Sequence, residues 1–319
     1  MPWQRHFKSK RVKEETILKN KYTREFLREE KKGYLFVLPA LIFMLAFVGY
    51  PIIYNLILSF KDVNVMTFSK SVKPFIGLKN YIEIFKDPTM KTSIWNTFIF
   101  TIGSISIQFV IGLALALFLN LKFKLAEPIR GLMVVSYLIP MTVTALLFKF
   151  MYSTSGGIIN ELLMKVHIIS KPIGWIISGN TSMLSVILTN SWVGIPFNML
   201  LLTTGLSNIS FTLYEAAQVD GASAIQRFFR ITLPELKPAI LSVLVLGFIY
   251  TFKVFDLVFV MTNGGPVNST ELMSTFAYKL SFTQFSFSRG ATVANVLFAI
   301  LFCVSLGYLG LIKDEEVIG

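Results

Sequence analysis

The chain has 319 residues, of which 54% are hydrophobic and only 15% are charged, with a formal net charge of +12. In a soluble domain about a quarter of the residues are charged. Because this chain has fewer charged residues and long apolar runs, we expect much of its surface to face a bilayer. Eleven of the 30 Lys and Arg residues lie in residues 1–33, and no basic stretch has a nucleic-acid-binding pattern, so anionic lipid is the better explanation of the charge than nucleic acid. The single cysteine, Cys303, excludes an intrachain disulfide, and two distant histidines, His6 and His167, do not suggest a metal site.

The first 33 residues are predicted to be a basic cytoplasmic tail. A secretory signal places a short apolar region behind a short basic stretch, whereas here a long charged segment precedes an apolar run of about 27 residues. That run therefore predicts a retained membrane span. Residues 12–32 are helix-prone and strongly charged, and they carry no motif that assigns them a role.

Six apolar windows are long enough to cross a bilayer of about 30 Å as helices. They are Tyr34–Phe60, Ser93–Leu121, Ile129–Tyr152, Met183–Leu206, Ala239–Met261 and Gly290–Ile312. Four prolines fall inside these windows: Pro39 and Pro51 in the first, Pro140 in the third and Pro196 in the fourth. A proline kink is tolerated in a membrane helix if neighbouring helices cover the carbonyl groups that it frees. The sequence therefore predicts an all-α membrane protein in which residues 34–312 form one six-span domain and 313–319 a short cytoplasmic tail.

The distribution of Lys and Arg predicts that both termini are cytoplasmic. With the N-terminus inside, the inner segments hold 18 of these residues and the outer segments ten. Without the tail the counts reverse, seven inside against ten outside, so the prediction depends on the first span. In the fifth window Lys253 and Asp256 are three residues apart, which would place them on one helical face as an ion pair, and snorkelling or packing is favoured over substrate contact.

The inner loop 207–237 has the chemistry of two short helices around a turn. Thr212 with Glu215 and Ser223 with Gln226 are capping-box patterns. Gly221 is suited to the left-handed conformation that ends a helix. We expect Pro234 to end the second helix and Pro238 to open the next span. That second helix would bury one side and expose the other, the buried side formed by Ile225, Phe228 and Phe229 and the exposed side by Gln226, Arg227 and Arg230.

This loop resembles the signature loop of ABC importer permeases. The resemblance lies in Glu215-Ala216-Ala217, Asp220-Gly221-Ala222, Phe228, Ile231, Leu233-Pro234 and Pro238. From about Tyr34 onward the chain is similar to the carbohydrate-uptake branch, the maltose-type and glycerol-phosphate-type permeases. The supporting stretches are Asn190-Ser-Trp192-Val-Gly194-Ile-Pro196-Phe197, Thr262-Asn-Gly-Gly-Pro266 and Phe255-Asp256-Leu257. The extra outer domain and added spans of the maltose-type permease are absent.

The resemblance implies the type I ABC importer permease fold and a subunit of a larger importer in the bacterial cytoplasmic (inner) membrane. Its implied partners are a second homologous permease, two cytoplasmic ATP-binding subunits and an extracytoplasmic solute-binding protein. No phosphate-binding loop occurs in this sequence, so ATP and Mg would be bound by the partner ATPases and the chain itself would bind no cofactor and be no enzyme. The residues implied to couple to the ATPase are Glu215, Ala216, Ala217, Asp220, Gly221, Ala222, Phe228 and Pro234.

The same resemblance places a sugar site on the fourth and fifth spans. Its candidate residues are Asn190, Gly194, Phe197, Gly247, Tyr250, Thr251 and Phe255. Amides and hydroxyls suit hydrogen bonds to a sugar, aromatic rings suit its C–H faces, and glycine lets a ligand approach the backbone. In the alternative interpretation these aromatic residues are packing residues, Asn190 bonds a neighbouring helix, and a partner permease carries the site.

Two other functions are compatible with such a membrane protein. A secondary transporter would need an ion-coupling site, for which the sequence offers Lys253 and Asp256 near one end of the fifth window. An importer subunit for a non-sugar or acidic solute, such as a sugar phosphate or uronate oligosaccharide, would be favoured if Lys149 and Lys253 faced the pathway. An intramembrane enzyme would need paired catalytic groups at depth, and the sequence offers none.

Overall fold

The computed structural model describes residues 34, 36–69, 73–121 and 123–316. The predicted tail 1–33 lies outside these residues, as do 317–319. Within the described residues the secondary structure is helical, apart from an isolated antiparallel bridge between Lys61 and Phe75. The all-α prediction is therefore confirmed for this part of the chain.

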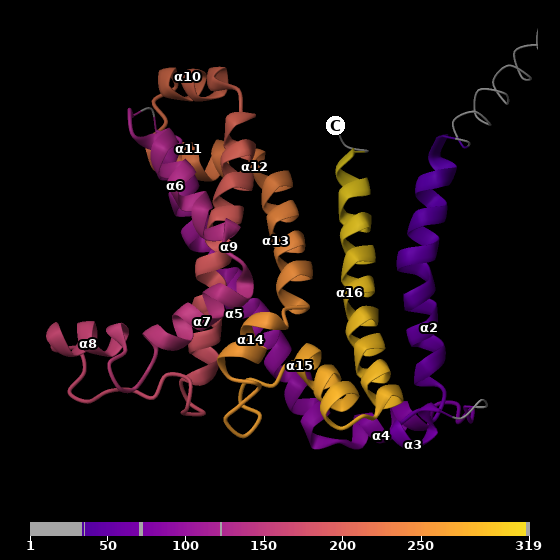
Figure 1. Ribbon diagram of the computed structural model, residues 1–319. Coiled ribbons are helices and arrows are strands. Elements are labelled where there is room, and N and C mark those ends of the chain that lie inside the picture. The colour runs from indigo at the N-terminus through magenta and orange to yellow at the C-terminus, as the bar shows by residue number, and fades with distance from the viewer. Residues whose placement is uncertain (1–33, 35, 70–72, 122, 317–319) are drawn as a thin grey trace, which may run out of the picture. The chain divides into compact units, whose positions relative to one another are not determined.

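The chain divides into two compact units, the first ending at Ile57 and the second beginning at Leu58. A helix that lies almost wholly in the first unit runs from Phe36 to Ser59, close to the predicted Tyr34–Phe60. It contains a π-helical turn, η1 (Leu45–Gly49), followed by α2 (Tyr50–Ser59) (Figure 1). The wider turn ends two residues before Pro51, which has no N–H to donate back along the helix.

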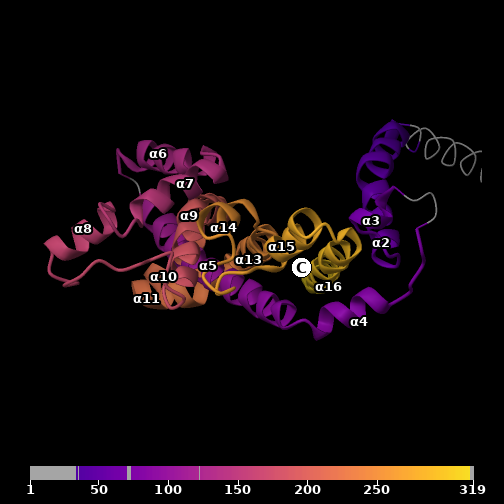
Figure 2. The ribbon, with the colours of Figure 1, turned by 60° about the horizontal axis from the view of Figure 1, so that its bottom comes forward.

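The second unit is built around two long helices, α5 (Pro88–Leu119) and α9 (Ser182–Ser207), which pack against each other. The next helix, α13 (Lys237–Phe252), contacts both, and α16 (Phe287–Glu316) packs against α13 (Figures 1 and 2). Close approach of α5 to α9 depends on Gly112, because a Cβ there would lie 2.7 Å from the Cβ of Asn198. Small residues allow membrane helices to approach each other closely in this way.

Short elements connect and flank these helices. They are α3 (Val65–Phe68), α4 (Lys79–Lys86), α8 (Ile158–Lys165), α10 (Phe211–Val219), α11 (Ala224–Arg227), η2 (Phe228–Thr232), α12 (Leu233–Glu235), α14 (Asp256–Met261), α15 (Met273–Tyr278) and η3 (Lys279–Thr283). Figure 1 shows α10 and α11 at one end of α9, and α14 and α15 towards its other end.

By length and composition, four helices of the described chain can cross a membrane, or up to six if each of two bent helix pairs counts as one span. The four are Phe36–Ser59, Pro88–Leu119, Ser182–Ser207 and Phe287–Tyr308. They coincide with the predicted first, second, fourth and sixth windows, although α16 continues past Ile312 to Glu316. A multi-pass membrane protein follows from these lengths.

The predicted third span is not one helix. It consists of α6 (Ala126–Leu138) and α7 (Met141–Met151), which are bent by 94°. A residue before proline avoids the helical region, and Ile139 accordingly has an extended ψ of 129° before Pro140, which has an extended ψ of 135°. The proline therefore breaks this segment instead of only kinking it, whereas α9 continues through Pro196.

The predicted fifth span, Ala239–Met261, is wrong at its C-terminal end. The helix α13 ends at Phe252, residues 253–255 form a break, and α14 begins a separate helix that packs against α7. Lys253 and Asp256 therefore do not share a helical face, and no ion pair joins them among the described residues. The Lys253 ammonium lies instead over the Tyr250 ring, 5.3 Å from its centroid.

Buried side chains on α9 belong to two hydrophobic clusters, one towards each end of the helix. Val186 and Ile187 pack with Phe100, Leu257 and Leu272 near its start. Towards its end lies a second cluster formed by Met199, Leu202, Leu206, Ala116, Leu119, Leu236 and Val243. The middle of α9, between these clusters, lines a cavity.

Candidate functional site

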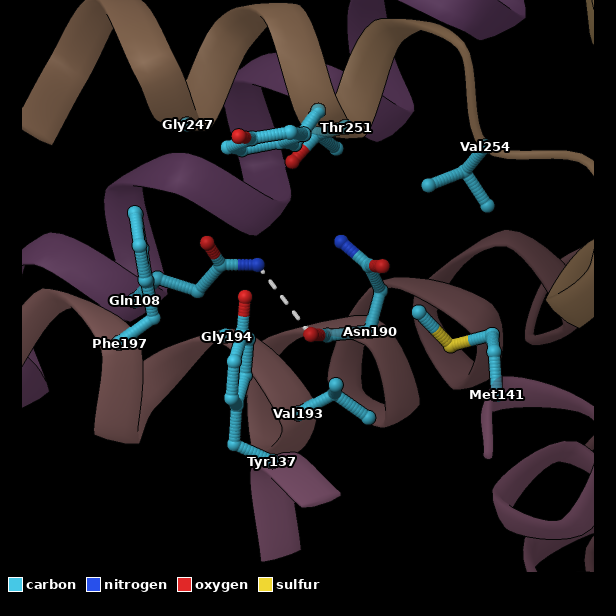
Figure 3. Close-up of a pocket in the computed structure, with 11 residues that line it drawn as sticks. Gln108, Tyr137, Met141, Asn190, Val193, Gly194, Phe197, Gly247, Thr251 and Val254 are labelled. Atoms are coloured by element: carbon cyan, nitrogen blue, oxygen red, sulfur yellow. Dashed lines mark hydrogen bonds between the residues drawn. The ribbon is translucent and has the colours of Figure 1, made fainter. Parts of the chain in front are cut away.

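A cavity of about 240 Å³ lies beside the middle of α9 (Figure 3). Gly194, which lines it, is twelve residues after Ser182 and thirteen before Ser207, so the cavity is at mid-length of a membrane-spanning helix. Substrate sites of transporters lie near that depth. The lining residues are Gln108, Tyr137, Met141, Asn190, Val193, Gly194, Phe197, Gly247, Tyr250, Thr251 and Val254.

Six of the seven candidate sugar-site residues line this one cavity. They are Asn190, Gly194, Phe197, Gly247, Tyr250 and Thr251. The seventh, Phe255, does not, because the break after Phe252 places it at the N-cap of α14. Its ring lies 4.9 Å, between centroids, from both Phe259 and Tyr278, outside the lining of this cavity.

Five lining residues were not among the candidates, namely Gln108, Tyr137, Met141, Val193 and Val254. Gln108 has a signal in the sequence, since an amide within an apolar span is costly and often functional. Tyr137 and Met141 flank the break at Pro140, and their positions depend on a 94° bend that a single straight span does not predict. Val193 and Val254 are apolar residues in apolar segments and give no such signal.

Three polar side chains of the cavity are at least nine-tenths buried: Gln108, Asn190 and Thr251. Figure 3 shows the amides of Gln108 and Asn190 next to each other, with Thr251 on the far side of the cavity. No hydrogen bond within the described residues involves the Asn190 amide or the Thr251 hydroxyl. The polar atoms of these two side chains are open to the cavity, so they are available to hydrogen-bond a ligand there.

Aromatic rings form another part of the wall. The Phe197 ring stacks on Tyr137 at 5.8 Å and meets Tyr250 edge to face at 6.0 Å between centroids. None of the lining residues is Asp, Glu, Lys or Arg. The cavity therefore combines aromatic faces with neutral donors and acceptors.

A second candidate site is the hairpin formed by α10, α11, η2 and α12, residues 211–235. Gly221 links α10 to α11 with a φ of +76°, as the left-handed turn predicted there requires. The Ser223–Gln226 capping box begins α11, which confirms that prediction. The hydroxyls of Tyr214 and Thr232 are 2.9 Å apart and join the two arms of the hairpin.

Two local predictions for this hairpin are wrong. Ser210, not Thr212, is the N-cap of α10, and the hydroxyls of these two residues bond each other at 2.8 Å, so no Thr212–Glu215 box forms. Pro234 does not end the second helix, because the helical run from Ala224 continues to Glu235. A π-helical turn, η2, precedes the proline, and its backbone hydrogen bonds join residues five apart instead of four. Pro238 opens α13 as expected.

Most residues assigned to ATPase coupling are open to a partner. Glu215, Ala216, Asp220, Gly221 and Pro234 are exposed, and Ala217, Ala222 and Phe228 are half-buried. Ile225 and Phe229, expected to be buried, are 72% and 60% exposed. The hairpin therefore presents an acidic residue and apolar side chains together.

Comparison with known proteins identifies the family. Residues 108–314 match the family described as the inner membrane component of binding-protein-dependent transport systems. The chain belongs to this family. The permease is 36% identical to the probable ABC transporter permease protein YurN of Bacillus subtilis over 89% of this chain and 96% of that protein. It is 32% identical to the trehalose/maltose transport system permease protein MalF of Thermococcus litoralis over 88% of this chain and 94% of that protein.

The fold of the permease is that of a solved importer. A bacterial ABC transporter involved in the import of the acidic polysaccharide alginate contains a chain that superposes with a TM-score of 0.76. The match covers 91% of this chain and 98% of that chain at 22% identity. The permease therefore has the all-helical type I importer permease fold.

Proposed function

We propose that this permease moves a sugar or oligosaccharide across the bacterial cytoplasmic membrane through the cavity beside Gly194. The observation that carries the proposal is that the Asn190 amide and the Thr251 hydroxyl line the cavity without a hydrogen bond to the described residues, beside the aromatic rings of Phe197 and Tyr250. Sugars offer hydroxyls to the first pair and C–H faces to the second. The relative named for trehalose and maltose transport, and the fold shared with an alginate importer, support the same substrate class.

Transport is driven from the hairpin 211–235. Its exposed Glu215, Ile225 and Phe229 give a cytoplasmic ATPase both a charge and an apolar surface to bind. Two helical arms joined by Tyr214 and Thr232 move as one body, so force on the hairpin passes to α9 and α13 at its ends. ATP and Mg are bound by that partner, and this chain supplies the pathway.

The assembly contains a second permease, two ATP-binding subunits and an extracytoplasmic solute-binding protein. Both termini are cytoplasmic in this arrangement. Within the second unit, the hairpin and the C-terminal end of α16 point to the same end in Figure 1, which supports a cytoplasmic C-terminus. A solved alginate ABC transporter in complex with an alginate pentasaccharide-bound periplasmic protein supports the solute-binding partner.

Uptake in cells tests this function. The complete importer should restore accumulation of radiolabelled maltose, trehalose or lactose in a strain without other uptake systems for these sugars, and accumulation should require ATP. The permease should also co-purify with an ATPase. A permease that purifies alone and transports with an ion gradient is a secondary transporter, and the proposal then fails.

A further inference from the structure

Gln108 is a buried polar residue of the cavity to which the proposed function assigns no role. It lies on α5, opposite the helix that carries Asn190 and Gly194, and its side chain is 4% exposed. A buried amide at this depth is stabilised only if its hydrogen bonds are satisfied. Its contacts therefore indicate what it does.

Two protein contacts hold the Gln108 amide in place. Its Nε2 donates to the backbone oxygen of Asn190 at 3.2 Å (Figure 3). Asn198 Nδ2 donates to its Oε1 over a long 3.5 Å. Asn198 Nδ2 also donates to the Gly194 oxygen at 2.9 Å. These bonds leave one N–H of Gln108 and acceptor capacity on its Oε1 for a ligand.

Gly194 provides the space that the Gln108 side chain occupies. A Cβ at position 194 would lie 2.3 Å from Gln108 Cδ and 2.5 Å from both its Nε2 and Oε1. No ordinary contact is that short, so a side chain at 194 and the observed position of Gln108 exclude each other. The expected reason for this glycine, approach of a ligand to the backbone, is thus replaced by approach of another side chain.

Resting on the proposed function, we infer that Gln108 is a specificity-determining residue that binds sugar hydroxyls together with Asn190. Each carboxamide offers an N–H donor and a C=O acceptor, which suits neighbouring hydroxyls of one ring. The preferred unit is an uncharged sugar, because the cavity lining contains no ionised group to balance a carboxylate or phosphate. Gly194 is required for this site because it leaves the space that the Gln108 side chain occupies.

A double-mutant cycle tests the inference in the complete importer, with uptake of radiolabelled maltose, trehalose and lactose as the readout. Gln108→Met keeps the length of the side chain and removes its amide. We expect it to raise the KM about five- to ten-fold while Vmax changes less than two-fold, as loss of one or two neutral hydrogen bonds predicts. Gly194→Ala should give a similar increase because it displaces the amide.

The deciding measurement is Gly194→Ala in a Gln108→Ala background. There the new methyl group enters vacated space, so we expect less than a two-fold further change in KM. An equal Gly194→Ala effect in both backgrounds, or an unchanged KM for Gln108→Met, overturns the inference. A merely structural role of Gln108 would lower Vmax and complex yield for all three sugars alike, whereas a specificity role changes the ratio of their KM values.

Controls separate folding and function from specificity. Thr101→Val removes a buried hydroxyl of α5 that lies outside the cavity and has no partner among the described residues, and KM should not change. If Gln108→Met does not assemble, Gln108→Asn, which keeps the amide but shortens it, should assemble and show the same direction of change. A wild-type importer that assembles but transports none of the three sugars refutes the proposed function itself, and the inference with it.

Discussion

Asn190 and Tyr250 contribute different chemistry to the cavity, and each can be removed separately. The Asn190 side chain is buried and its amide faces the cavity, whereas Tyr250 is 54% exposed and contacts Phe197 and Lys253 through its ring. Loss of either should therefore affect ligand binding more than folding.

Asn190→Ala and Tyr250→Ala are expected to abolish uptake while the importer still assembles. The first removes hydrogen bonds to the ligand and the second removes an aromatic face. Uptake and the yield of co-purified subunits measure the two effects. Phe255→Leu is the matched control, since its ring packs on Phe259 outside the cavity, and it should retain the wild-type KM. Unchanged uptake by both alanine variants would place the sugar site elsewhere.

The ion pair between Glu271 and Lys279 is a second residue-scale feature with a measurable consequence. The Glu271 side chain is 1% exposed, and Lys279 also donates to the Asn263 oxygen at 2.8 Å. Lys279→Met leaves a buried carboxylate unpaired, which costs about 3–5 kcal/mol. Thermal unfolding of the detergent-solubilised protein should show a large loss of stability, and Glu271→Gln combined with Lys279→Met should recover part of it. Equal stability of both variants would show that the pair is not coupled.

At the scale of elements, the hairpin 211–235 depends on its turn. A Cβ at Gly221 would meet no atom within 4 Å, so any cost of substitution there comes from the positive φ alone. Glu215 adds an exposed charge on the arm before that turn.

Gly221→Ala should destabilise the hairpin by about 1–2 kcal/mol, because the left-handed conformation disfavours a Cβ. Gly221→Asn should cost less, since asparagine tolerates that conformation. Combined with Glu215→Lys, the alanine variant should uncouple ATP hydrolysis from uptake. The measurement is the ratio of sugar transported to ATP hydrolysed in proteoliposomes. A wild-type ratio would remove the hairpin from the coupling mechanism.

Sequence patterns predict this molecule best where the signal is local or long. The apolar windows locate four long helices closely, and the Ser223–Gln226 spacing predicts a cap that forms. Breaks are predicted less well, because Pro140 ends a helix while Pro196 does not, and packing around each proline decides the outcome. The candidate cavity residues were predicted from the family resemblance. Gln108 was not among them, because it reaches the cavity only through the contact between two helices that are far apart in sequence.

At the scale of the whole molecule, the proposed orientation in the membrane can be tested by labelling introduced cysteines. Cys303 is the single cysteine, so replacing it by serine leaves a background for labelling at chosen positions. Gln218 lies on the hairpin and Lys165 at the end of α8, and both are exposed.

In intact cells, a membrane-impermeant maleimide should label Lys165→Cys and should not label Gln218→Cys. After the membrane is permeabilised, both should be labelled. The reason is that the hairpin faces the cytoplasm and the loop that carries α8 faces outward in the proposed orientation. Labelling of Gln218→Cys in intact cells would reverse the orientation.

The bend between α6 and α7 joins two straight helices, and each helix contributes one residue to the lining of the cavity. Tyr137 belongs to the first and Met141 to the second, with only three residues between them. A small rotation about Ile139 and Pro140 therefore changes the separation of these two side chains without deforming either helix. The size of the cavity therefore depends on the angle of this bend, and an inhibitor that filled the cavity would fix that angle.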